Sequence, residues 1–91
     1  MTNAPQNDIA QLAVSMSRGL GCRTQTTARL HELFNHAGKA LPHYVGAPSD
    51  YSYVNMPAHI YAPAIYSAAR KGGMGRVESA RLWFDARFSR P

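Results

Sequence analysis

The sequence is poor in the residues that build covalent frameworks and membrane anchors. It contains one cysteine, Cys22, in 91 residues, so no disulfide can form within the chain. We interpret Cys22 as an ordinary small thiol, and a chain without disulfides favours a cytoplasmic, intracellular location. The N-terminal residues lack the basic and apolar regions of a signal peptide. No segment approaches the roughly 18 apolar residues of a membrane span, so we expect no membrane contact.

Acidic residues are also few, which limits the acid–base chemistry that the chain can perform. Five Asp and Glu stand against ten Lys and Arg, a net charge of +5. Two of the acids, Glu78 and Asp85, fall on the charged side of one predicted helix, where solvated side chains are the simplest explanation. No sequence feature marks Cys22 or a serine as a nucleophile with a nearby base. We therefore expect no enzymatic activity and no catalytic residues.

The spacings required for metal or nucleotide binding are missing as well. The histidines and the cysteine do not follow any zinc-ligand spacing; they are His31, His36, His43, His59 and Cys22. Gly73 and Gly75 begin a dinucleotide-type pattern, but position 78 is Glu instead of Gly. Gly38-Lys39 is followed by Ala40, which does not fit a P-loop. We predict no metal and no cofactor.

What the sequence does contain is helical periodicity. Apolar residues recur on one stripe over 8–19 and again over 25–37, with a glycine after each stripe. The stripes consist of Ile9, Leu12, Ala13, Met16 and Leu20, and of Leu30, Leu33, Phe34, Ala37 and Leu41. Asn7 or Asp8 is expected to cap the first helix, and Thr24, Thr26 or Thr27 the second. Residues 1–7 are polar and are expected to be loose.

Two further helices are predicted in the C-terminal third, over 63–71 and 76–88. Pro63 suits the first turn of the third helix, whose inward residues would be Tyr61, Ile65, Ala68 and Ala69. In the fourth helix, Val77, Ala80, Trp83, Phe84 and Phe88 share one broad face, which we expect to anchor the core. The fold class is therefore all-α: a single domain, residues 1–91, forming a small bundle of three to four helices.

The segment between the second and third helices, residues 42–62, is a long Tyr/Pro-rich loop. The alternation in 51–55 is typical of a short strand, but no partner strand is evident, so we interpret the segment mainly as loop. All five tyrosines lie between Tyr44 and Tyr66, and no Lys or Arg lies between those two. Tyrosine is common at protein interfaces, whereas base-stacking platforms usually include basic residues. The alternative is that some of these tyrosine rings fold back over the helices and complete a small core.

The positive charge is concentrated in residues 70–91, which carry six basic and two acidic residues. Residues 63–88 also match part of the helix-turn-helix pattern, with Ala69, Gly73 and Met74 around the turn. Ser79 stands where that pattern has a branched apolar residue, and Gly72 where it has a leucine. Glu78 and Asp85 would also face the phosphates of DNA.

Two functions follow as hypotheses. The first is a non-catalytic binding protein that docks on a protein with an acidic surface, or on its own copies. The residues expected to do so are Tyr44, Tyr51, Tyr53, Arg70, Lys71 and Arg76. Such small basic proteins are typical of accessory factors, inhibitors and small components of assemblies, including phage ones. The alternative is a DNA-binding regulator using Arg70, Lys71, Arg76, Arg81 and Arg87.

Overall fold

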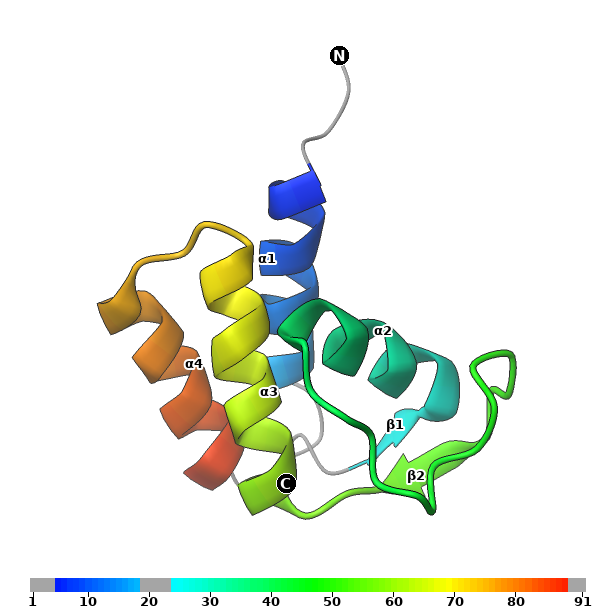
Figure 1. Ribbon diagram of the computed structural model, residues 1–91. Helices are drawn as coiled ribbons and strands as arrows, with labels where there is room; N and C mark the ends of the chain where they lie inside the picture. Colours follow the sequence, from blue (N-terminus) through cyan, green and yellow to red (C-terminus); the bar gives the residue numbers. More distant parts are fainter. Residues whose placement is uncertain (1–4, 19–23, 89–91) are drawn as a thin grey trace.

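The computed structural model describes residues 5–18 and 24–88, and the side chains from residue 8 onward (Figure 1). The elements in chain order are α1 (Pro5–Ser17), β1 (Thr24–Thr26), α2 (Thr27–Ala37), β2 (Tyr53–Asn55), α3 (Ala58–Lys71) and α4 (Arg76–Phe88). The prediction of a small, mainly helical bundle is confirmed, with a two-stranded sheet added to it.

The first helix begins earlier than predicted. It runs from Pro5 to Ser17 instead of over 8–19, because proline is well tolerated in the first turn, where a backbone N–H has no helical partner. Its predicted stripe is correct: Ala13 and Met16 are buried, and Ile9 and Leu12 pack against the core. The predicted end at Gly19, and Leu20 and Cys22, lie outside the described residues.

The second helix is close to its prediction, with both ends set by local hydrogen bonds. Thr26 caps the N-terminus, where its Oγ1 accepts from the backbone N–H of Arg29 at 3.3 Å. Gly38 ends the helix with φ of 70°, a left-handed conformation that favours glycine, and its N–H donates to the carbonyl of Asn35. The buried residues are Thr27, Leu30, Leu33, Phe34 and Ala37.

The short strand at Tyr53–Asn55 does have a partner, which corrects the sequence interpretation. It pairs antiparallel with Thr24–Thr26, so that Gln25 lies opposite Val54. A three-residue strand is too short to show a periodic signal, and the predicted second helix, 25–37, includes part of β1. The pairing is continued by the loop, because Thr27 and Ala28 donate their N–H groups to the carbonyls of Ser52 and Asp50 at 2.9 and 3.0 Å.

The third helix begins at Ala58, five residues before the predicted start. Pro63 therefore lies inside α3, where it removes one backbone hydrogen bond. The first turn holds nevertheless, because Ile60 and Tyr61 donate to the carbonyl of Pro57, at 3.0 and 3.1 Å. Tyr61 and Ala62 are fully buried, so their burial favours a helix upstream of the proline. The segment between α2 and α3 therefore ends at Pro57 instead of at residue 62 as predicted.

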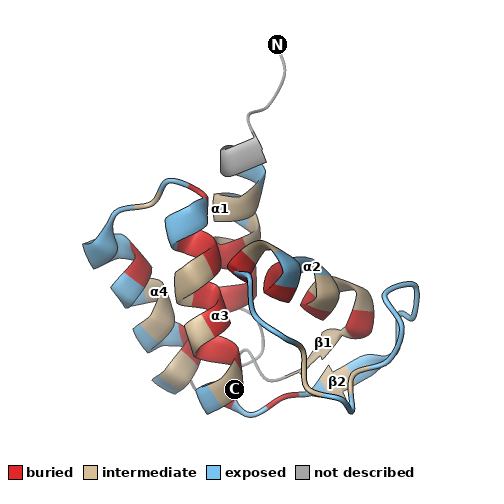
Figure 2. Cartoon of the chain, viewed as in Figure 1, coloured by how far each residue is buried: buried red, intermediate tan, exposed pale blue. Residues whose placement is uncertain are grey.

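The centre of the fold is α3, which contacts all three other helices. Figure 2 shows buried residues along much of its length and on the α1 and α2 faces turned toward it. The predicted inward residues of α3 are all buried: Tyr61, Ile65, Ala68 and Ala69. Because α3 is rich in alanine, its neighbours can pack close to its backbone.

The fourth helix has the predicted bounds but not the predicted inward face. It buries Ser79 and Ala86, with Leu82 and Trp83 partly buried. Val77, Phe84 and Phe88 are instead 77%, 57% and 52% exposed, and Ala80 is exposed as well. The expectation that this broad aromatic face anchors the core is therefore wrong for all of its members except Trp83. Close packing against α3 favours the small Ser79 and Ala86 at the contact, which turns the phenylalanines outward.

Candidate functional site

The outward side of α4 carries an exposed aromatic face, which we define as Val77, Phe84 and Phe88. The rings of Phe84 and Phe88 lie 4.8 Å apart between centroids, and Phe88 makes an edge-to-face contact with Trp83 at 6.0 Å. The guanidinium of Arg87 lies 5.2 Å from the Phe88 ring centre, within cation–π range. Exposed apolar side chains gathered in this way are typical of interaction sites.

A groove lies beside this face, between α3 and α4, with a volume of about 400 Å³. Its lining is Lys39, Pro63, Tyr66, Ser67, Ala80 and Trp83, and we call it the α3–α4 groove. Trp83 lines the groove and also contacts Phe88 of the aromatic face. The groove and the aromatic face therefore form one continuous surface. Pro63, which interrupts the hydrogen bonding of α3, is part of this lining.

The aromatic face also borders the side of α4 that faces α1. A second depression there, of about 300 Å³, is lined by Ser17, Arg18, Phe84, Asp85 and Phe88. A smaller one next to it includes Glu78, Arg81 and Asp85. Both acids of α4 thus lie toward α1, away from the α3–α4 groove.

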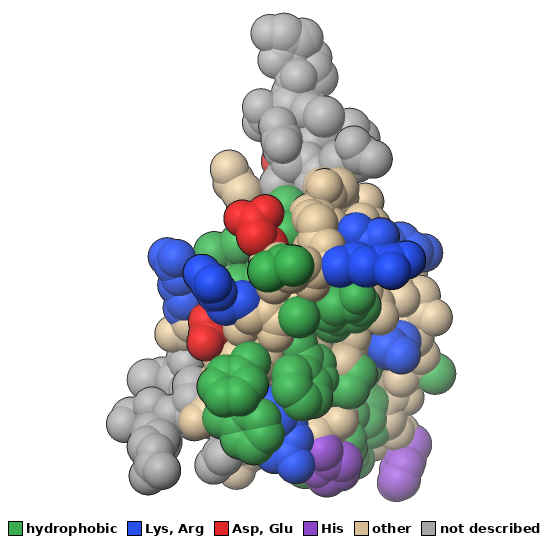
Figure 3. Space-filling model, turned by 90° about the vertical axis from the view of Figure 1, so that its left-hand side faces the viewer, with side chains coloured by type: hydrophobic (Ala, Val, Ile, Leu, Met, Phe, Trp, Pro, Cys, Tyr) green, Lys and Arg blue, Asp and Glu red, His purple; other side chains and the backbone are tan. Residues whose placement is uncertain are grey.

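Basic residues surround the α3–α4 groove. Lys39 lines it directly, and Nζ of Lys71 lies close to Gly38, next to Lys39. Arg76 and Arg87 stand on the same helical stripe as Ala80 and Trp83, at its two ends. None of the five acidic residues lines this groove. Figure 3, which faces the α4 side, shows hydrophobic side chains in the middle with Lys and Arg at several edges.

Three of the five basic residues singled out from the sequence, Arg70, Lys71 and Arg76, lie at the turn between α3 and α4. Arg70 uses Nη1 to donate to the carbonyl of Met74 at 2.8 Å, so it helps to hold this turn. Gly73 has φ of 92°, a conformation that favours glycine. Lys71 and Arg76 are exposed on either side of the turn, Arg81 is exposed on α4, and Arg87 is partly buried near its end.

The three tyrosines predicted to bind a partner lie elsewhere. Tyr44, Tyr51 and Tyr53 are 48%, 74% and 73% exposed. Tyr53 belongs to β2, which lies at the opposite end of the molecule from the α3–α4 turn (Figure 1). The structure therefore does not bring these tyrosines together with Arg70 and Arg76. The other two tyrosines belong to α3: Tyr61 is buried, and Tyr66 lines the α3–α4 groove.

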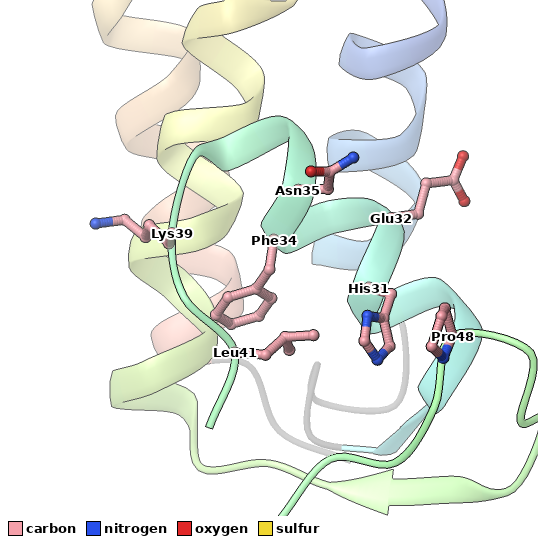
Figure 4. A pocket seen from close by; sticks show the side chains of 7 residues that line it. All are labelled: His31, Glu32, Phe34, Asn35, Lys39, Leu41 and Pro48. Atoms are coloured by element: carbon pink, nitrogen blue, oxygen red, sulfur yellow. The ribbon is translucent and has the colours of Figure 1, made fainter. Parts of the chain in front are cut away.

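Another depression, of about 500 Å³, lies between α2 and the following loop (Figure 4). It contains His31 and Glu32, but Glu32 points away from His31, so the two do not form an acid–base pair. The His31 ring donates through Nε2 to the carbonyl of Gly46 at 2.6 Å and so helps to hold the loop. Within residues 5–18 and 24–88, no group of three His, Cys, Asp or Glu side chains is arranged to hold a metal ion.

Comparison with known proteins finds no matching family model, no similar curated protein and no similar solved structure. Of the helices in the described part of the chain, none has the length and apolar character needed to cross a membrane.

The sequence interpretation did not predict the aromatic face of α4 or the α3–α4 groove, because it places Phe84 and Phe88 in the core and gives Lys39 no role. One signal was present. The apolar residues of the fourth helix extend over two faces, since Leu82 and Ala86 lie away from Val77 and Phe88 on the helix. Only one of those faces can pack against a single neighbouring helix.

Proposed function

We propose that this protein is a non-catalytic binding module that docks on another protein through the aromatic face of α4. The observation that carries the proposal is the exposure of Phe84 and Phe88, the side chains that would otherwise be the natural core anchors of this helix. Aromatic side chains are enriched in protein interfaces because they remove a large apolar area from water on docking.

The charges next to the aromatic face support a protein partner with acidic character. Arg87 stacks on Phe88, while Lys39, Lys71 and Arg76 lie around the neighbouring groove. Complementary charge raises the rate of encounter and selects among partners more than it adds affinity. The role that fits is an accessory factor, an inhibitor or a small component of a larger assembly in the cytoplasm, and a second copy of the chain is one candidate partner.

Site-specific photo-crosslinking in the native host tests this proposal. A photoreactive phenylalanine analogue replaces Phe84 in one variant and Tyr51 in a second, since both side chains are more than half exposed. We expect a discrete protein adduct from position 84, identified by mass spectrometry. Adducts from position 51 alone would move the docking site to the tyrosine loop, and adducts from neither position would refute the proposal.

A DNA-binding regulator is the second candidate, and one observation favours it. Gly73 has the positive φ of a turn glycine and Ser79 is fully buried, so α3, the turn and α4 reproduce part of the helix-turn-helix pattern. Against it, the outward side of α4 exposes phenylalanines next to Glu78 and Asp85 instead of a polar, basic surface.

Electrophoretic mobility shift on random duplex DNA at two salt concentrations separates the candidates. A tight complex whose affinity falls steeply with salt would favour DNA binding. In that case Arg70, Lys71, Arg76, Arg81 and Arg87 are the residues to substitute. We expect no shift at low salt.

A further inference from the structure

We propose that the α3–α4 groove binds an acidic amphipathic peptide segment of the partner, with apolar side chains in the groove and carboxylates on its basic surroundings. This inference rests on the proposed function, because it names the chemistry of the segment that docks next to the aromatic face. It uses residues that the sequence interpretation did not connect: Lys39 from the loop after α2, Pro63 and Tyr66 from α3, and Trp83 from α4.

The first argument is the shape and polarity of the groove. Most of the lining is apolar or aromatic, from Pro63, Tyr66, Ala80 and Trp83. The polar groups are the hydroxyls of Tyr66 and Ser67 and the Lys39 ammonium. Ala80 is small and exposed, so the side chains on either side of it leave room for an inserted apolar group. A volume of about 400 Å³ accommodates two or three large apolar side chains from one face of a helical peptide.

The second argument is the sign of the surrounding charge. Lys39 and Lys71 lie near one another on the α2 side, and Arg76 and Arg87 lie at the two ends of the α4 stripe. Arg76 and Arg87 are eleven residues apart, which corresponds to about 16 Å along a helix, or about three turns of a docked helix. Acids at intervals of one turn along such a peptide would reach this row of cations, and no acid of the protein lines the groove to oppose them.

These cations are also available to a partner. Within the described residues no ion pair engages Lys39, Lys71, Arg76 or Arg87, and Lys39, Lys71 and Arg76 are exposed. No acid among the lining residues of the groove offsets their positive charge, whereas Glu78 and Asp85 line the same depression as Arg81 on the α1 side of α4.

A peptide fits this groove better than a single-stranded nucleic acid does. Base stacking requires an open ring face. Trp83 is packed against the core on one side and contacts Phe88 edge to face, so its ring is already engaged. The adjoining Val77, Phe84 and Phe88 extend the apolar surface beyond the groove, which suits the apolar side chains of a peptide.

The single tryptophan of the chain allows a direct test, because Trp83 lines the groove. The probe is a synthetic helical peptide of about 16 residues with leucines on one face and glutamates on both flanks. The control peptide is identical except that lysine replaces every glutamate. We expect the glutamate peptide to change the Trp83 fluorescence and to bind at least about tenfold more tightly than the lysine peptide.

A charge swap distinguishes a direct contact from an indirect effect. In Lys39→Glu/Arg76→Glu, affinity for the glutamate peptide should fall about tenfold while affinity for the lysine peptide rises. The matched control, Arg18→Glu/Arg81→Glu, has the same change in net charge on the other side of α4, where Arg18 and Arg81 line depressions facing α1. It should retain the wild-type preference. Circular dichroism confirms that both double variants are folded.

Three results would overturn the inference. They are equal affinity for the two peptides, no change in Trp83 fluorescence at millimolar peptide, and tighter binding of oligothymidylate than of the glutamate peptide. The last would assign the groove to single-stranded nucleic acid. If the peptide fails while position 84 still crosslinks to a protein in the host, the docking function stands and only the chemistry assigned to the groove is wrong.

Discussion

Tyr61 of α3 donates its hydroxyl to the backbone carbonyl of Met16 in α1, at 3.4 Å, inside the core. Tyr61 is fully buried and Met16 nearly so, although they are 45 residues apart in the chain. This bond connects the N-terminal helix to the central one through a buried hydroxyl. The tyrosine-rich stretch of the sequence thus contributes one ring to the core and others to the surface.

Replacing Tyr61 with phenylalanine removes this bond and preserves the ring. We expect the free energy of unfolding to fall by about 1 kcal/mol, the usual net value of a buried hydrogen bond. Urea denaturation followed by circular dichroism measures it. Tyr51→Phe is the matched control, because the Tyr51 side chain is 74% exposed and its substitution should leave the stability unchanged. Equal stability of Tyr61→Phe and wild type would contradict the structural role of the bond.

Ser79 offers a stabilising substitution. Its Oγ is buried and has no hydrogen-bond partner within the described residues, at the contact between α4 and the core. Ser79→Ala removes the unsatisfied hydroxyl and introduces a better helix former, so we expect the free energy of unfolding to rise by about 1 kcal/mol. Ser67→Ala in α3 is the control, since Ser67 is only partly buried and its gain should come from helix propensity alone. A loss of stability in Ser79→Ala would show that the hydroxyl has a bonding role.

The orientation of α4 can be tested by comparing neighbouring aromatic residues. Trp83 packs against the core, whereas the adjacent Phe84 is 57% exposed. We expect Trp83→Ala to lower the free energy of unfolding by about 2 kcal/mol or more, and Phe84→Ala to lower it by less than about 1 kcal/mol. Thermal denaturation of the two variants gives the comparison. A larger loss of stability in Phe84→Ala than in Trp83→Ala would show that Phe84, and not Trp83, is the residue packed in the core.

Acid should weaken the loop that covers the start of α2. The pKa of Asp50 lies below its ordinary value of 3.8, because its carboxylate accepts hydrogen bonds from the backbone N–H and the hydroxyl of Ser52, both at 2.9 Å. A lowered folded-state pKa means that the stabilisation is complete above the unfolded-state pKa and is lost as the pH falls through the folded-state value. Asp50→Asn should therefore flatten the pH dependence of stability in the acid range.

A carbon-detected NMR titration of the Asp50 side chain measures this pKa directly. A midpoint for Asp50 at or above the ordinary value of 3.8 would refute the bond to Ser52 in solution.

Much of the fold was accessible from the sequence. Each of the first two helices has one apolar side, so only one orientation of each helix buries it. The structure confirms these orientations: α1 buries Ala13 and Met16, and α2 buries Leu30, Leu33, Phe34 and Ala37. The small sheet was not accessible, because three residues such as Thr24–Thr26 show no periodicity before a partner is in place. The early start of α3 was hidden by Pro63, whose missing hydrogen bond is offset by burial of the residues before it.

The candidate site was harder to predict from the sequence than the fold. Arg70, Lys71 and Arg76 do gather at one turn, which their closeness in the sequence already implied. Lys39 and Pro63 could not be assigned to the same groove as Trp83, because they come from separate segments that meet only when α3 packs between α2 and α4.

The sequence by itself determined the helical class, because the spacing of apolar residues along a helix is a local property that survives any packing arrangement. It also determined the excess of basic charge in the C-terminal part. Which face of α4 is buried was decided only by the tertiary structure. Ser79 and Ala86 fit against the alanine-rich α3 more closely than phenylalanines would, and this steric preference leaves Phe84 and Phe88 exposed.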